Sequence, residues 1–195
     1  MGVEADQRQS LFDTMLIRDK IVSNGVIVLS DVSKQADAIV NKILIHKQRY
    51  ESIAHTFPNP GLKWWLIAVI HYMECSLNFN CYLGNGQPLT MRTTIVPKGR
   101  GPFRSFEEGA IDAITLQGLD KVTDWSIGNV LYILEGYNGY GYSLYHGINS
   151  PYLWSGTNQY TSGKYIFDGT YNPNAVSGQI GAAIILKKLL DTDSQ

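Results

Sequence analysis

The run from Trp64 to Met73 constrains the fold more than any other part of the chain, because it is apolar nearly all round. A helix without a polar face has to be buried on every side, so this run predicts a central helix against which other elements pack. One acid, Glu74, stands at its C-terminal end. Burial near Ile67 and Ile70 and the negative end of the helix dipole would both raise the pKa of this carboxyl group. A general acid needs a raised pKa of this kind.

The residues after this helix predict a small β-hairpin beside the helix end. Gly84-Asn85-Gly86-Gln87-Pro88 is polar and rich in turn formers, and Leu89 to Val96 alternates as a strand does. The rest of the chain carries helical patterns, so the expected fold class is mainly α with a small β-hairpin (α+β). The expected helices cover residues 6–22, 32–55, 105–119, a stretch opened by Asp124, and residues 174–190.

Two motifs carry a family resemblance. Glu74-Cys75-Ser76-Leu77-Asn78-Phe79-Asn80 is similar to the segment of lytic transglycosylases and goose-type lysozymes in which a catalytic Glu ends a core helix and is followed by Ser. Tyr137-Asn138-Gly139 resembles a second element of lytic transglycosylases, whose Tyr approaches the catalytic Glu and the sugar. The span 49–189 resembles uncharacterised bacterial and phage proteins of the lysozyme-like superfamily. The resemblance implies one lysozyme-like domain over residues 1–195, with residues 1–56 as helical N-terminal support.

The resemblance also implies an activity. It indicates a peptidoglycan glycosidase (muramidase) that cleaves the β-1,4 bond between N-acetylmuramic acid and N-acetylglucosamine, with Glu74 as the general acid. Ser76, Tyr137 and Asn138 are then expected to contact the substrate. Glu135 stands where lytic transglycosylases usually have a small apolar residue. It is either a second cleft carboxylate that contacts the substrate or an ion-pair partner.

The distribution of acids leaves the mechanism open. No Asp or Glu occurs between Glu74 and Glu107, so the predicted hairpin offers no carboxylate as a nucleophile. A lytic transglycosylase would use Glu74 alone, as acid and then base, whereas an inverting hydrolase would need a water that Thr93 or Thr94 could position. In related proteins Asp often stands at the position of Gln87, which weakens a catalytic role there and leaves Gln87 as an expected substrate contact.

A long aromatic segment follows the second motif. Its rings alternate with Gly, Asn, Ser and Gln, and sugar rings stack on aromatic faces while amides and hydroxyl groups orient their hydroxyls. Tyr152 and Trp154 are the predicted stacking residues, and the alternative for these rings is packing in the core beneath a long loop. The same composition also suits a chitinase-like enzyme or a non-catalytic saccharide-binding protein, and both stay open as alternatives.

Composition and charge limit the other partners. A formal net charge of −1 gives no general attraction to nucleic acid or to an anionic membrane, and the sequence reveals no local basic patch that would supply one. The run 64–70 is too short to cross a bilayer, so no integral membrane segment is expected. The four His show no metal-ligand spacing, and we predict no metal and no cofactor. The expected protein is a monomer that binds a β-1,4 amino-sugar polymer.

The beginning of the chain and its cysteines bear on location. Residues 1–24 carry charges throughout and lack the apolar core of a signal peptide, so we expect synthesis in the cytoplasm and action at the bacterial cell wall after release or export. Cys75 and Cys81 are six residues apart, which suits neither a zinc site nor a disulfide framework. The sequence therefore predicts two reduced thiols.

Overall fold

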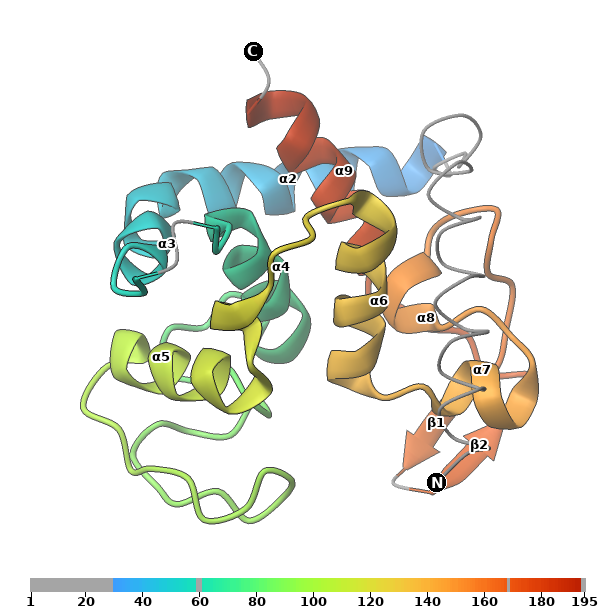
Figure 1. Ribbon diagram of the computed structural model, residues 1–195. Coiled ribbons are helices and arrows are strands. Elements are labelled where there is room, and N and C mark those ends of the chain that lie inside the picture. The colour runs from blue at the N-terminus through green and yellow to red at the C-terminus, as the bar shows by residue number, and fades with distance from the viewer. Residues whose placement is uncertain (1–29, 59–60, 168, 194–195) are drawn as a thin grey trace. The chain divides into compact units, whose positions relative to one another are not determined.

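The computed structural model describes residues 30–58, 61–167 and 169–193. These residues form two compact units, one made of residues 30–39 and 124–193 and the other of residues 40–123. The structure is mainly helical with a small antiparallel sheet of two strands (Figure 1). The predicted helix at residues 6–22 lies outside the described residues. The assignment of the whole chain to one domain stays a prediction.

The unit of residues 40–123 is built around α4 (Trp64–Cys75). Every residue of α4 except Glu74 is buried, as its apolar sequence predicts. Helix α3 (Lys47–Ala54) packs on α4 and also contacts α5 (Phe106–Gln117), and the 3-10 helix η1 (Leu119–Lys121) follows α5. Ser105 caps α5 by accepting a hydrogen bond from the Glu108 N–H, and the Glu108 carboxylate in turn accepts one from the Arg104 N–H.

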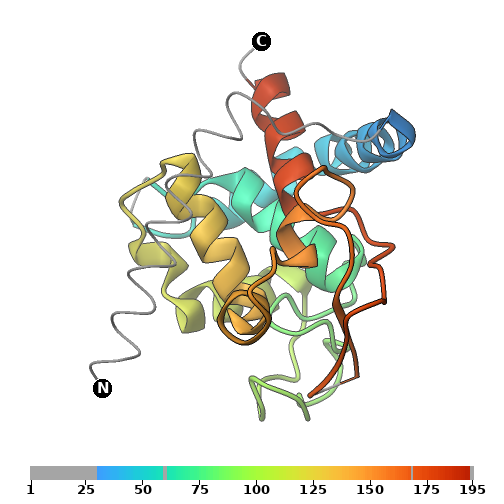
Figure 2. The same ribbon diagram turned by 90° about the vertical axis from the view of Figure 1, so that its right-hand side faces the viewer.

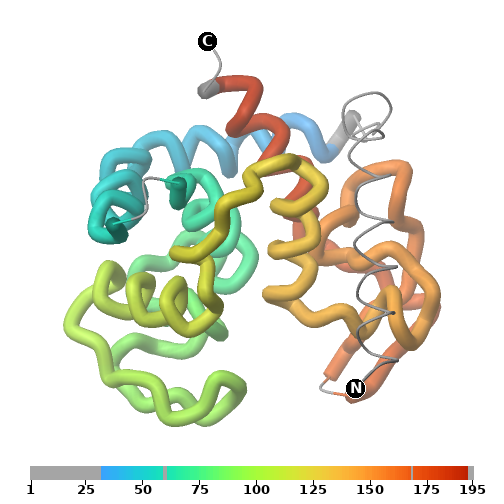
Figure 3. Tube along the Cα trace, in the orientation of Figure 1, coloured from blue at the N-terminus to red at the C-terminus, as the bar shows by residue number. Residues whose placement is uncertain are grey.

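Residues 76–105, which we call the connection, link α4 to α5 without a helix or a strand (Figure 3). The strand predicted at 89–96 is therefore wrong. One isolated antiparallel bridge joins Cys81 to Pro88, and residues 89–96 find no neighbouring strand. An alternating pattern gives a strand only where a partner strand runs beside it. In this connection, single backbone bonds from Leu89 to Asn80 and from Thr93 to Arg100 replace a regular ladder, and the Gln87 side chain bonds to the next two N–H groups.

The unit of residues 30–39 and 124–193 contains α6 (Ile127–Asn138), α7 (Gly141–His146), α8 (Pro151–Trp154) and α9 (Ala182–Asp193). Helix α8 packs against α9 and α6 (Figure 2). The approach of α8 to the start of α9 is so close that a Cβ on Gly181 would lie 2.2 Å from the Leu153 carbonyl oxygen. Glycine is required at this contact for that reason.

The small hairpin of the fold lies in this unit. Strands β1 (Lys164–Phe167) and β2 (Thr170–Asn172) are antiparallel, with Tyr165 opposite Tyr171. The hairpin packs on α7 through ring contacts. His146 stacks on Tyr171 with ring centroids 3.5 Å apart, and its Nε2 shares a 2.8 Å hydrogen bond with the Tyr165 hydroxyl. A β-hairpin was expected in the chain, but about seventy residues earlier.

Several helix boundaries differ from the prediction. The long helix expected at 32–55 is two helices, α2 (Ser30–Ile45) and α3, with His46 between them. Helix α6 begins after Ser126, not at Asp124, and Asp124 accepts a hydrogen bond from the Ser126 N–H two residues later. The last helix begins at Ala182, so residues 174–181 are not helical. Among the described helices, none combines the length and the apolar character needed to cross a bilayer.

Candidate functional site

Glu74 lies in the last turn of α4 and is the partly exposed residue of an otherwise buried helix. The helix ends at Ser76, whose φ of 50° is left-handed, and Leu77 follows with φ of 65°. Two consecutive residues other than glycine in this region carry strain of roughly 1 kcal/mol each. Their N–H groups bond to the Tyr72 and His71 carbonyl oxygens, so the chain turns sharply away directly after the carboxylate.

A disulfide joins Cys75 to Cys81, with 5.8 Å between their Cα atoms. The prediction of two reduced thiols is wrong. The left-handed turn at Ser76 and Leu77 brings the chain back toward the end of α4, which places the two thiols within bonding distance. The cross-link fixes residues 76–80 next to Glu74. The spacing of the two cysteines did not predict it, because two cysteines alone form no recognisable disulfide framework.

The Gly-rich turn of the connection packs directly on the backbone of Glu74. Gly86 has a φ of +76°, and a Cβ at this position would lie 2.7 Å from the Glu74 carbonyl oxygen. The Tyr82 N–H donates to the Gln87 carbonyl oxygen at 2.7 Å and closes the turn. The predicted proximity of this turn to the helix end is therefore present, although the strand after it is not.

The side chain of Gln87 organises the next part of the connection. Its Oε1 accepts hydrogen bonds from the N–H groups of Thr94 (2.7 Å) and Ile95 (3.3 Å), and its Nε2 donates to Thr94 Oγ1 (2.9 Å). The predicted contact of Gln87 with substrate would require this side chain to leave three hydrogen bonds. In the described conformation it holds the loop.

Thr93 and Thr94, the two candidates for positioning a water, differ in their surroundings. Thr93 is buried, its hydroxyl donates to the Pro97 carbonyl oxygen at 2.5 Å, and it accepts from the Arg100 N–H at 2.9 Å. Its hydroxyl proton is therefore committed to the loop. Thr94 is exposed, and its oxygen accepts from Gln87 while its proton is not engaged by that bond.

Two polar groups of the helices in this unit, the half-buried Asp112 and the buried His71, lie near the connection. The Asp112 carboxylate of α5 accepts hydrogen bonds from the Arg100 guanidinium and, at 2.7 Å, from the Tyr82 hydroxyl. Burial raises the pKa of Asp112, but these bonds lower it more, and the net pKa lies below the ordinary value. His71 of α4 is fully buried and shares a 2.8 Å hydrogen bond with the Tyr50 hydroxyl, so it is a core residue.

Phe79, in the middle of the disulfide loop, packs into an aromatic cluster. Its ring centroid is 4.6 Å from His71 and 4.9 Å from Phe106, and the Arg49 guanidinium lies 4.0 Å over its face. A cavity of about 360 Å³ opens beside this cluster and is lined by Arg49, Phe79, Phe103 and Phe106 among others. Glu74 does not line it.

A larger cavity, of about 540 Å³, lies within the unit that contains α6 to α9. We call it the α6–α8 cavity. It is bordered by the C-terminal end of α6, the starts of α7 and α8, and the hairpin β1–β2. Its polar lining consists of Asn138, Lys164, Ser177 and Gln179, and its aromatic lining of Tyr142, Tyr152, Tyr165 and Phe167.

Two of the predicted substrate contacts meet in the α6–α8 cavity. Asn138 is the last residue of α6 and is exposed, and Tyr152 lies in the first turn of α8. Tyr137, half-buried, precedes Asn138, and Gly139 ends the helix with a φ of +93°, so the Tyr137-Asn138-Gly139 element ends a helix as expected. Lys164, Ser177 and Gln179 were missed, and the turn former Gly169 between two aromatic runs was the signal that could have located their hairpin.

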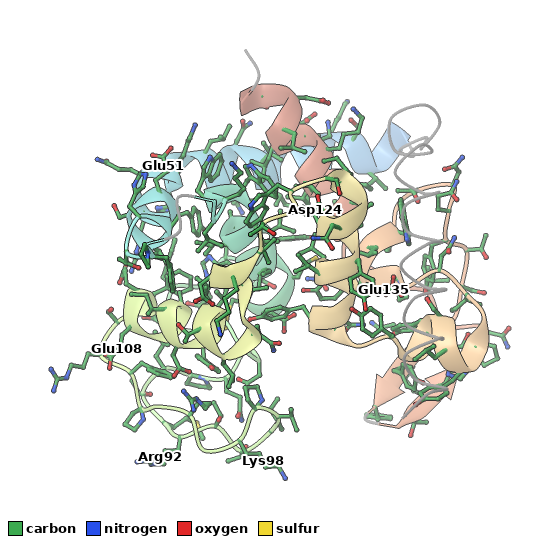
Figure 4. All side chains as sticks on the ribbon, in the orientation of Figure 1. Glu51, Arg92, Lys98, Glu108, Asp124 and Glu135 are labelled. Carbon is green, nitrogen blue, oxygen red and sulfur yellow. A yellow bond between two sulfur atoms is a disulfide. The ribbon has the colours of Figure 1, made fainter. Side chains whose placement is uncertain are left out.

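Two other predicted contacts lie in the interior. Trp154 is fully buried, so its ring packs in the core and presents no face for a sugar to stack on. Glu135 is also fully buried, and its Oε1 accepts a 2.8 Å hydrogen bond from Ser143 of α7 (Figure 4). This bond ties α7 to α6. Of the two roles proposed for Glu135, contact with a polymer in solution does not fit its burial.

No protein-family model, curated protein or solved structure matches this chain. Within the described residues, no group of three or more His, Cys, Asp or Glu side chains is placed to hold a metal ion.

Proposed function

We propose that this chain is a peptidoglycan glycosidase that uses Glu74 as the general acid at the bond between N-acetylmuramic acid and N-acetylglucosamine. The placement of Glu74, partly exposed at the end of an otherwise buried helix, is the observation that carries the proposal. The α6–α8 cavity belongs to the other unit and supports a sugar ligand by its own lining, which combines aromatic rings with neutral amides and a hydroxyl group. Stacking on the half-buried Tyr165 and hydrogen bonds from Asn138 suit a pyranose ring, whereas Tyr152 is only 8% exposed and offers little of its face. The cation of Lys164 suits a sugar polymer that bears carboxylates better than it suits chitin.

Glu74 is the proposed proton donor for three reasons. It is partly exposed at the end of a rigid, buried helix, so a substrate oxygen can reach a carboxyl group whose position is fixed. The disulfide and the contact with Gly86 hold the chain on both sides of it. Backbone strain of the kind seen at Ser76 and Leu77 occurs preferentially at functional sites.

A lytic transglycosylase is the second candidate, and the state of Thr93 favours it. A water that attacks the anomeric carbon has to be held by a hydrogen-bonding group, and the Thr93 proton already binds Pro97. Thr94 remains for that task. A transglycosylase needs no water, because the muramyl O6 hydroxyl attacks C1, the C1–O4 bond breaks, and the proton lost from O6 returns to Glu74 after Glu74 has protonated O4.

The test is digestion of purified peptidoglycan, with mass spectrometry of the released muropeptides. Hydrolysis gives reducing ends and transglycosylation gives 1,6-anhydro ends, which differ by one water. Glu74→Gln should lower the rate by roughly 10²-fold to 10⁴-fold while the fold survives. Glu51→Gln is the matched control, because it removes an acid of the same unit that forms only a 3.8 Å surface ion pair with Lys47.

Three results would contradict the proposal. Near-normal rates for Glu74→Gln would remove Glu74 as the acid. Release of sugar from colloidal chitin but not from peptidoglycan would favour a chitinase-like enzyme. If neither polymer is cut and Glu74→Gln binds both as the unaltered chain does, the protein is a saccharide-binding module.

A further inference from the structure

The far part of the connection, residues 91–100, exposes apolar side chains to solvent. We call these residues the outer loop. Val96 is 79% exposed, Ile95 52% and Met91 41%. Exposure of each side chain to water is unfavourable, and we call these three residues, which fall within six positions, the apolar tip. No role in the proposed glycosidase site accounts for it.

Hydrogen bonds fix this exposure. The Ile95 N–H donates to Gln87 Oε1, and the Ile95 carbonyl oxygen accepts from Asn85 Nδ2 at 3.3 Å. Thr93 closes the loop by its bonds to Pro97 and Arg100, and the Gly99 N–H donates to the Thr93 carbonyl oxygen at 2.8 Å. Because its backbone is tied on both sides, Ile95 cannot turn inward without losing these bonds.

Cations accompany the apolar tip. Arg92 and Lys98 are exposed and project from the outer end of the connection (Figure 4). Arg92 donates one hydrogen bond to the Gly99 carbonyl oxygen at 3.1 Å, which leaves its charge uncompensated by an acid. Arg100, by contrast, is neutralised by Asp112. No acid occurs between Glu74 and Glu107, so the outer loop is positive although the chain as a whole carries −1.

We propose that the outer loop is a docking surface for an anionic lipid membrane. Ile95 and Val96 enter the region between headgroup and acyl chain, and Arg92 and Lys98 contact the lipid phosphates. Apolar insertion combined with cations is the pattern of proteins that lie on an anionic bilayer. A hydrated anionic polymer would satisfy the two cations but would leave the apolar side chains in water, so charge and apolar exposure together favour lipid.

Co-sedimentation of the full chain with vesicles tests the proposal. Vesicles of phosphatidylcholine with about one-third phosphatidylglycerol should bind the chain, and vesicles of phosphatidylcholine alone should bind it much less. Replacing both apolar residues (Ile95→Ser with Val96→Ser) should weaken binding at least tenfold. Lys98→Gln should weaken binding roughly fivefold at low salt. At high salt the effect of this substitution should be smaller, because salt already screens the attraction between the loop and the lipid phosphates.

Matched controls separate the loop from general surface properties. Ile45→Ser removes an Ile that is 77% exposed at the end of α2, and Lys121→Gln removes an exposed cation of η1. Both should bind as the unaltered chain does. Val96→Trp adds a fluorescent side chain at the tip of the loop. Its contribution, obtained by subtracting the emission of the unaltered chain, should shift to shorter wavelength when anionic vesicles are added.

The proposal is overturned if the unaltered chain stays in solution with anionic vesicles. It is also overturned if Ile45→Ser loses as much binding as the Ile95/Val96 double variant, because the apolar effect would then not be local. Binding that depends on Lys98 but not on Ile95 and Val96 would contradict lipid insertion and assign the loop to an anionic polymer instead.

Discussion

The connection at residues 76–105 and the segment at 139–181 are both long, polar and rich in glycine, yet they are organised in different ways. The connection is held by a disulfide and by the side chains of Gln87, Thr93 and Asn85, which bond to its backbone. The segment 139–181 contains two short helices and a hairpin that meet through stacked rings and surround a cavity. The first is a cross-linked, hydrogen-bonded loop beside Glu74, and the second is a set of short elements around a cavity lined in part by aromatic rings.

This difference predicts which property, stability or ligand binding, a mutation in each region will change. Substitutions in the connection should change stability, because each organising side chain serves several backbone groups at once. Substitution of an exposed lining residue of the α6–α8 cavity, such as Asn138, should change binding while stability is largely kept, because that side chain is not packed in the core.

Acid should weaken the connection through His71. Burial lowers the pKa of His71 to about 4, opposed by a hydrogen bond with the Asn78 backbone. An unfolded His titrates near pH 6.5, so between pH 6.5 and 4 the unfolded chain binds a proton that the native chain excludes. The free energy of unfolding should fall by about 3 kcal/mol as pH drops through this window, and urea titrations at each pH measure it.

His71→Gln should flatten this part of the profile while keeping a polar partner for Tyr50. Its stability at pH 7 should be lower, because a well-packed ring is lost next to Phe79. His55→Gln replaces an exposed His of the same unit and should follow the unaltered chain. Equal slopes for His71→Gln and the unaltered chain would show that another group governs the acid response.

Removing the disulfide should cost about 2 kcal/mol, the chain-entropy value for a loop this short. The double substitution Cys75→Ser with Cys81→Ser is the variant, and thermal unfolding measures the loss. Activity should fall as well, because residues 76–80 are no longer fixed beside Glu74. An unaltered melting temperature would show that Gly86 and the hydrogen bonds hold the connection without the cross-link.

Gly86→Ala should destabilise by roughly 2 kcal/mol, since the added Cβ meets both an unfavourable φ and the Glu74 carbonyl oxygen. Gly99→Ala is the matched control, because Gly99 has nearly the same φ, +78°, but open space where the Cβ would stand. It should lose about 1 kcal/mol. The difference between the two measures the contact with Glu74, and equal losses would mean that the turn moves aside freely.

Asn138→Ala should weaken the binding of saccharide about fivefold, the value of one hydrogen bond, and leave the melting temperature unchanged. Asn138 is exposed and lines the α6–α8 cavity, whereas Asn41 is exposed on α2 and serves as the control. Calorimetry with muropeptides measures binding. A lower melting temperature with unchanged affinity would reverse the contrast between the two regions.

The sequence predicted those features that depend on local pattern. Trp64 to Cys75 is a helix because no face of it is polar, and Ser105 with Glu108 marks the start of α5 because a cap is a contact over three residues.

Features that depend on distant partners were not predictable in this way. Leu89 to Val96 alternates as a strand does, but Gln87 and Arg100 supply the bonds that a neighbouring strand would have given. The disulfide depends on two left-handed residues whose sequence, Ser-Leu, gives no sign of them. The burial of Trp154 and Glu135 depends on how α6, α8 and α9 pack, which periodicity within one segment does not specify.

The left-handed pair at Ser76 and Leu77 has a consequence for laboratory evolution. Glycine adopts this conformation without the steric penalty, so either position should gain about 1 kcal/mol when it is replaced by glycine. A selection for heat resistance should return glycine at these two sites early. If the Ser76 hydroxyl contacts the substrate, the variants recovered at position 76 will be more heat-resistant but will have a lower catalytic rate. Those recovered at position 77 will be more heat-resistant with an unchanged catalytic rate.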